Sequence, residues 1–79
     1  MALVNSRGLL RDARANGYAV GAFNVENMEM MQAVIAAAEA EHAPVILQTT
    51  PSTLKYAEPA VFAAMARAMA AKASVPVAM

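Results

Sequence analysis

The sequence predicts an α/β fold assembled from consecutive strand-helix units. Short apolar runs occur at positions 18–24, 45–48 and 74–79. Between them lie longer segments in which apolar residues recur at helical spacing. Strands that alternate with helices in this way pair in parallel and are joined by right-handed crossovers. We therefore expect the chain order helix, strand, helix, strand, helix, strand.

The first predicted helix starts at Ser6, which is a suitable N-cap, and ends at Asn16-Gly17, a pair that favours the left-handed helix stop. The run at 18–24 that follows is apolar without regular alternation. That pattern is typical of a strand buried on both faces of a parallel sheet. We expect this strand to end at Asn24.

The second predicted helix has a clear start and a clear end. Asn27 can cap it, with Glu29 near its positive end, and apolar residues continue at helical spacing until the chain reaches His42. Pro44 then excludes further helix, so the β-branched run at 45–48 is predicted to be the second strand.

The remainder of the chain is predicted to be loop, helix and strand. The turn-rich segment 49–53 is expected to be a loop. Pro59 suits the first turn of a third helix that lasts to about Ala73. Residues 74–79 then begin a third strand.

This order fits either a doubly wound sheet or a (β/α)8 barrel. A barrel needs about 250 residues, so 79 residues would supply the first two βα units and the third strand. The third strand runs to Met79 without a helix behind it to cover its face. We therefore expect residues 1–79 to be the N-terminal part of one incomplete barrel domain.

Composition argues against several classes of protein. Six basic and six acidic residues give a net charge of zero, which removes the field that attracts nucleic acid or an acidic membrane surface. Arg67 interrupts the longest apolar stretch before the roughly 18 residues of a membrane span, and the first residues lack a secretory pattern. There is no cysteine. We expect a cytoplasmic protein without nucleic-acid or membrane partners.

Polar residues follow the first two predicted strands, where parallel α/β folds place their ligand sites. Asn24 could exchange hydrogen bonds with a polyhydroxy substrate, and a turn-stabilising asparagine is the equally weighted alternative. Segment 49–53, which includes Thr50, supplies hydroxyl groups, although a capped turn explains them as well. The glycine spacing of a phosphate-binding loop is absent.

Other chemistry finds little support in the sequence. Lys55 could form a Schiff base with a carbonyl substrate, but a solvated loop lysine is the more common case. His42 is the sole histidine, and a catalytic zinc site takes about three protein ligands, so we expect no metal site within this chain. No carboxylate pair for acid-base catalysis is evident.

An ordered series of segments covers nearly the whole chain: Val4-Asn5-Ser6, Gly17-Tyr-Ala-Val-Gly-Ala-Phe-Asn24, Asn27 with Glu29, Met31-Gln-Ala-Val34, His42-Ala-Pro-Val-Ile-Leu-Gln48 and Val75-Pro-Val-Ala78. This series resembles the N-terminus of class II ketose-bisphosphate aldolases. The resemblance implies a zinc-dependent (β/α)8 lyase of glycolysis and related carbohydrate metabolism. In such enzymes zinc polarises the substrate ketone.

The substrate implied is fructose 1,6-bisphosphate or tagatose 1,6-bisphosphate, reversibly cleaved to dihydroxyacetone phosphate and glyceraldehyde 3-phosphate. In this family the third strand runs into a His-Leu-Asp-His segment that carries the proton-transferring Asp and a zinc-binding His, and this chain stops at Met79, before that segment. The resemblance therefore implies an enzyme that is a homo-oligomer when complete, and a chain that alone is inactive and binds no zinc.

Two residues carry over to substrate binding by resemblance. Asn24 matches the asparagine of strand one, and Thr50 stands where the family commonly has a substrate-contacting Ser, which keeps the hydroxyl. The loop Thr50-Pro-Ser-Thr53 is similar to the Thr-Pro-Gly-Thr of tagatose-bisphosphate aldolases. A non-catalytic βαβ interaction module, which self-associates through open sheet edges, is the alternative from another functional class.

Overall fold

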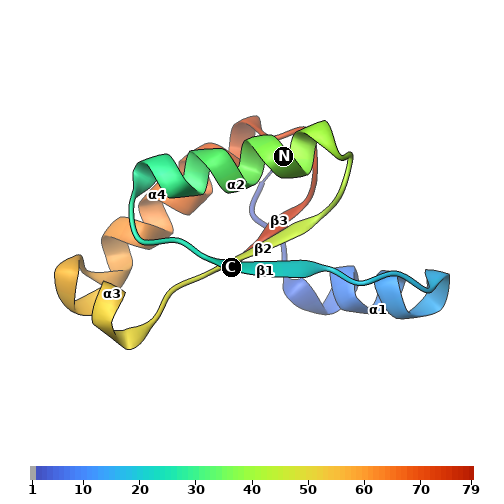
Figure 1. The fold of residues 1–79 in the computed structure, drawn as a ribbon, viewed down its shortest axis with the longest axis horizontal. Helices are drawn as coiled ribbons and strands as arrows, with labels where there is room; N and C mark the ends of the chain where they lie inside the picture. The colour runs from blue at the N-terminus through green and yellow to red at the C-terminus, as the bar shows by residue number, and fades with distance from the viewer. Residues whose placement is uncertain (1) are drawn as a thin grey trace.

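A computed structural model describes residues 2–79. The elements follow one another in the order α1 (Ser6–Asn16), β1 (Gly21–Asn24), α2 (Met28–Ala40), β2 (Val45–Gln48), α3 (Pro51–Tyr56), α4 (Pro59–Lys72) and β3 (Val77–Ala78), as Figure 1 shows. Strands and helices therefore alternate as predicted, with one additional short helix, α3.

The three strands form one parallel sheet in the order β1-β2-β3, which confirms the predicted parallel pairing. Gly21 pairs with Val45, and Val45 pairs in turn with Val77. On the outer side of β3, the Val4 N–H donates to the Val77 carbonyl at 2.9 Å in an isolated parallel bridge. Within residues 2–79, the outer edge of β1 has no strand beside it.

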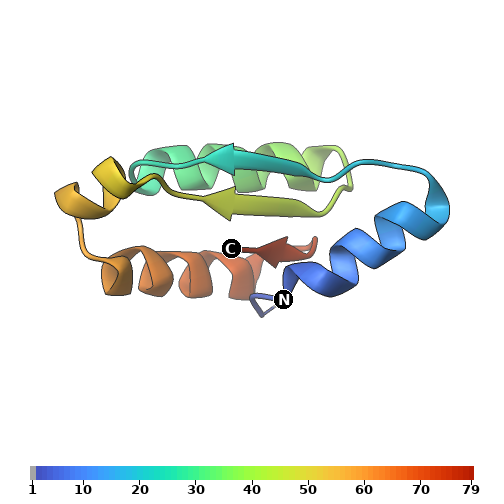
Figure 2. The ribbon, with the colours of Figure 1, turned by 90° about the horizontal axis from the view of Figure 1, so that it is seen from below.

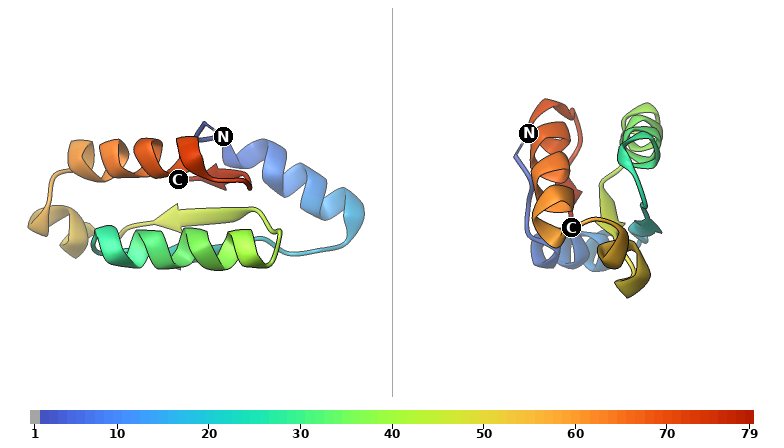
Figure 3. Two further views of the ribbon diagram at one scale, coloured as in Figure 1. Left: turned by 90° about the horizontal axis from the view of Figure 1, so that it is seen from above. Right: turned by 90° about the vertical axis from the view of Figure 1, so that its left-hand side faces the viewer.

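Helices α2 and α4 lie side by side on one face of the sheet (Figure 3). Both crossovers place their helix on the same side because both are right-handed. The core between these helices and the sheet contains the largest fully buried side chains: Phe62, Met31, Leu47, Val25 and Val77. No helix covers the middle of the opposite face, and α1 lies at the amino ends of the strands (Figure 2).

The expectation that the first strand is buried on both faces is wrong. Ala22, Phe23 and Asn24 are exposed, whereas Val45 and Leu47 in the central strand are buried on the side of the helices. β1 lies at the edge of the sheet and one of its faces is not covered, so its apolar composition does not lead to burial within this chain. The Phe23 ring lies over Gly21, whose missing side chain leaves the space.

The boundaries of α1 and β1 differ from the prediction. Asn5, and not Ser6, is the N-cap of α1, and its side chain accepts a hydrogen bond from the Arg7 N–H at 2.8 Å. Gly17 ends α1 with φ 71°, as predicted. The strand then starts at Gly21, later than expected.

The later elements agree more closely with the sequence. The Asn27 side chain caps α2 by accepting from the Met30 N–H at 2.8 Å, and Pro59 opens α4. His42 lies after α2 with φ 51°. The predicted loop at 49–53 is wrong in part, because α3 starts at Pro51.

No helix among the described residues is long and apolar enough to cross a membrane.

A carboxylate joins the end of α2 to the segment before β3. Glu39 Oε2 accepts hydrogen bonds from the Ser74 N–H at 3.0 Å and the Ser74 hydroxyl at 2.9 Å. These bonds hold the pKa of Glu39 below its usual value, against a smaller opposing effect of desolvation. Because the folded pKa is the lower one, this contribution to stability is complete above the unfolded pKa of about 4.5 and is lost as pH falls through the folded pKa.

Replacing Glu39 with Gln is therefore expected to lower the urea midpoint of unfolding at pH 7, and the difference from the parent should shrink at acidic pH, below pH 4.5. Urea titrations followed by circular dichroism at several pH values measure this. Glu41→Gln is the matched control, because the Glu41 side chain makes no hydrogen bond within residues 2–79. A difference that persists unchanged in acid would contradict the assignment.

Candidate functional site

The carboxyl ends of β1 and β2 bring two amide side chains together. Asn24 and Gln48 are partners in the register of the sheet, and Gln48 Nε2 donates to Asn24 Oδ1 at 2.8 Å. Side chains alternate along a strand, and Val45 and Leu47 point toward the helices. Gln48 and its partner Asn24 therefore lie on the helix-free face.

Thr50 lies two residues beyond the end of β2 and begins α3. Its side chain accepts a hydrogen bond from the Thr53 N–H at 3.3 Å, and Pro51 takes the first helical position, where its missing N–H costs nothing. Thr50 Oγ1 also lies 3.0 Å from Ser52 Oγ and 2.9 Å from Thr53 Oγ1. Three hydroxyl groups thus form one cluster next to the carboxyl end of the sheet.

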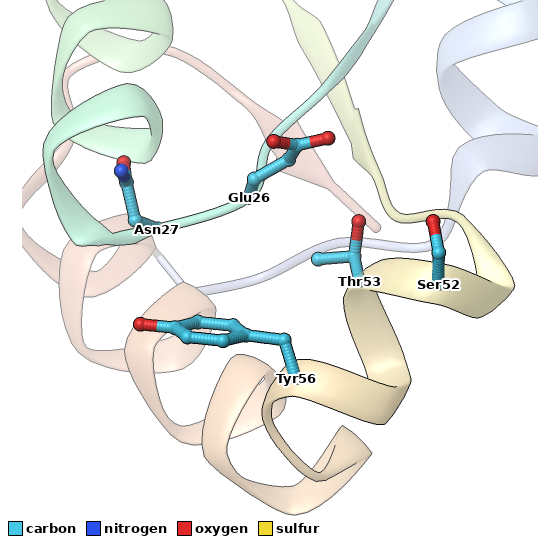
Figure 4. A pocket seen from close by; sticks show the side chains of 5 residues that line it. All are labelled: Glu26, Asn27, Ser52, Thr53 and Tyr56. Atoms are coloured by element: carbon cyan, nitrogen blue, oxygen red, sulfur yellow. The ribbon is translucent and has the colours of Figure 1, made fainter.

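A pocket of about 320 Å³ lies beside this cluster. Figure 4 shows the side chains around it, which come from the segment after β1 and from α3: Glu26, Asn27, Ser52, Thr53 and Tyr56. The lining contains one carboxylate and no lysine or arginine. Its electrostatics therefore favour hydroxyl groups of a ligand over phosphate groups.

The structure brings Asn24 and Thr50, the two residues predicted to bind substrate, to the same end of the sheet. Gln48, Glu26 and Tyr56 at this end were not among the predicted site residues. Gln48 could have been found from the sequence, because it ends the second strand as Asn24 ends the first.

The residues of this chain do not fit a zinc site. His42 is the sole histidine and lies before β2, at the opposite end of the sheet from Asn24. Within residues 2–79 no three histidine, aspartate or glutamate side chains are grouped closely enough to hold a metal ion. Lys55 is exposed near the end of α3 and does not line the pocket.

The family model described as fructose-bisphosphate aldolase class-II matches residues 4–79. This chain belongs to the class II fructose-bisphosphate aldolase family. The match confirms the resemblance seen in the sequence, and the open parallel sheet agrees with part of a class II aldolase barrel. Class II aldolases are lyases, and the family implies zinc in the full enzyme.

Curated proteins similar to this chain are named fructose-bisphosphate aldolase. Fructose-bisphosphate aldolases from Streptococcus pyogenes serotype M3 and Streptococcus pneumoniae serotype 4 are each 50% identical over 56 residues, which is 71% of this chain and 19% of the relative. The Thermus caldophilus fructose-bisphosphate aldolase is 48% identical over 77 residues, which is 98% of this chain and 25% of that protein. The chain thus spans about a fifth to a quarter of the length of these relatives.

Thr50→Val should destabilise the chain, because valine cannot accept the Thr53 N–H and leaves the Thr53 hydroxyl without its partner. Loss of an N-cap costs about 0.5 to 2 kcal/mol. Thr50→Ser keeps the oxygen and is the matched control. Free energies of unfolding from urea titration measure both variants, and equal values for the two would contradict the capping role.

Proposed function

We propose that this chain forms the first two βα units and the third strand of a class II aldolase barrel. The complete enzyme reversibly cleaves a ketose 1,6-bisphosphate, either fructose or tagatose 1,6-bisphosphate, to dihydroxyacetone phosphate and glyceraldehyde 3-phosphate. The family match over residues 4–79 carries this proposal. The open parallel sheet with polar side chains at its carboxyl end supports it, because barrel enzymes place their active sites at that end.

Asn24 and Thr50 are proposed to contact the substrate. The Asn24 side-chain oxygen Oδ1 already accepts a hydrogen bond from Gln48. The Asn24 Nδ2 group can therefore donate toward the helix-free face. That face is the interior of a barrel when the sheet closes. The Asn24 amide would therefore meet an acceptor oxygen of the substrate, and Thr50 lies at the same end.

Zinc and the proton-transferring Asp are proposed to be supplied by residues outside this chain. The sole histidine, His42, lies at the amino end of β2, so it cannot serve as a ligand of a catalytic zinc ion at the carboxyl end of the sheet. The complete enzyme is further proposed to be a cytoplasmic homo-oligomer with a sugar bisphosphate as its substrate.

The test uses a chimera in which residues 1–79 of this chain replace the aligned segment of the Thermus caldophilus enzyme. We expect the purified chimera to bind zinc and cleave fructose 1,6-bisphosphate, and residues 1–79 alone to do neither. A coupled assay and metal analysis measure both properties. Asn24→Leu in the chimera should raise KM.

Two results would contradict the proposal. One is stoichiometric zinc bound by residues 1–79 alone, which would place the metal site within this chain. The other is a chimera that is folded and zinc-loaded but inactive.

The alternative is an interaction module that pairs with a second copy, and the free edge of β1 favours it. Phe23 is 52% exposed there, beside an apolar groove of about 420 Å³ between β1 and α2. A discrete dimer of residues 1–79 in sedimentation, with cooperative unfolding, would support the module. Aggregation or a molten state would support an unfinished barrel.

A further inference from the structure

An apolar groove lies beside the free edge of β1, on the face of the sheet that carries the helices. Phe23 pairs in register with Leu47, which is buried toward the helices, so the Phe23 side chain points to the same face. Phe23 is nevertheless 52% exposed. It borders the groove of about 420 Å³ between β1 and α2, whose lining is apolar except for Glu41. An exposed aromatic ring on the core side of a parallel sheet indicates a helix layer that residues 2–79 do not complete.

The α2 side of this groove is built from small residues. Ala33 and Ala37 are one helical turn apart, both are exposed, and both line the groove together with the half-buried Val34. Small side chains allow a second helix to approach to an interaxial distance of about 8 to 10 Å. On its other side α2 already lies against α4. Within residues 2–79, α2 therefore has a helix neighbour on one side and an uncovered apolar groove on the other.

The two crossovers of this chain show where a further helix would lie. Helix α2 connects β1 to β2, α4 lies between β2 and β3 in the chain, and both helices pack on the same face (Figure 3). A strand added in parallel to the free edge of β1 would be followed by a helix on that same face. This helix would lie beside α2 and over Phe23, which is the position of the groove.

Charge at the rim of the groove favours this orientation. Helices of such units run antiparallel to the strands, so the added helix would end near Glu41, just after the end of α2. On the other side of α2, Lys72 in the last turn of α4 and Glu39 line one hollow. Glu41 offers the corresponding place to a basic residue in the last turn of the added helix, where the helix dipole also stabilises a cation.

A second copy of the chain matches the groove less well. Two copies paired through β1 by a twofold axis run antiparallel. The first turn of the partner's α2, which is acidic, would then lie at the end of α2 that carries Glu41. Like charges would meet there, which is unfavourable.

We propose that the groove receives the helix of the last βα unit of the complete barrel, and that Phe23 is buried beneath it. The inference rests on the proposed function, because a (β/α)8 barrel places its last strand beside its first. This chain covers 25% of the Thermus caldophilus relative, so the remainder of a complete enzyme can supply that unit. The helix is expected to be apolar toward Phe23 and Ala37 and to carry a basic residue beside Glu41.

The first test measures the accessibility of α2 in the chimera. Residues 1–79 contain no cysteine, so Ala37→Cys gives this chain a single thiol, placed in the groove. Ala40→Cys is the matched control, because Ala40 is exposed on the same helix and does not line the groove. We expect a maleimide to label Ala37→Cys at least about tenfold more slowly than Ala40→Cys, since a covered thiol reacts only through local opening. Equal labelling rates would overturn the inference.

The second test identifies what covers the groove. The photo-cross-linker p-benzoylphenylalanine replaces Phe23 in one variant of the chimera and the exposed rim residue Glu41 in another. Irradiation should link either position to a peptide of the last βα unit within the same chain, as read by mass spectrometry of the digest. A link to a second chain, a link to another unit, or no link in a folded variant would contradict the proposed occupant.

Both readouts are independent of activity. A folded chimera with a covered groove that does not cleave fructose 1,6-bisphosphate would refute the proposed function alone. An active chimera in which Ala37→Cys is labelled as fast as Ala40→Cys would refute this inference alone.

Discussion

The parallel pairing of β1 with β2 is the constraint on which the candidate site depends. Because Asn24 pairs with Gln48 in register, the two strands end at the same level, and their last side chains meet at 2.8 Å. A shift of one residue in this register would turn one of the two amides toward the helices. The chain that continues from β2 would then also begin α3 from a different position, and the place of Thr50 relative to Asn24 would change.

The same pairing explains why one face of the sheet is free. Right-handed crossovers put α2 and α4 on one side, where they bury Met31, Phe62 and Leu47 against the strands. The other face keeps only α1 at the amino ends of the strands, and the outer edge of β1 is unpaired within residues 2–79. A parallel sheet normally has both faces covered, so this sheet has the geometry of one part of a closed barrel wall.

Local signals in the sequence were sufficient for α2 and α4. Asn27 and Pro59 mark their first turns, and their apolar spacing marks the buried side. The start of α1 was misplaced because Asn5 and Ser6 are both good caps. The helix α3 was missed because Thr-Pro-Ser-Thr is typical of turns, although a Thr cap followed by Pro also starts a helix.

Other features of the site depend on contacts between segments that are far apart in the sequence, and no single segment predicts them. Exposure of β1 depends on which elements lie beside it, and its composition describes the environment of a complete sheet. The pairing of Gln48 with Asn24 depends on register between strands that are 24 residues apart. The cluster of the Thr50, Ser52 and Thr53 hydroxyl groups depends on the helical turn of α3, which was not visible in the polar composition of segment 49–53.

The most direct test of the unfinished barrel wall is amide hydrogen exchange at β1. The Val25 N–H donates to the Gln48 carbonyl, and successive amides of a strand point to opposite sides, so the Ala22 and Asn24 amides point to the free edge. We predict fast exchange of these two amides in residues 1–79 alone and strong protection once the chain is joined to the remainder of an aldolase. Equal protection in both proteins would show that the edge is already closed, and would contradict the account.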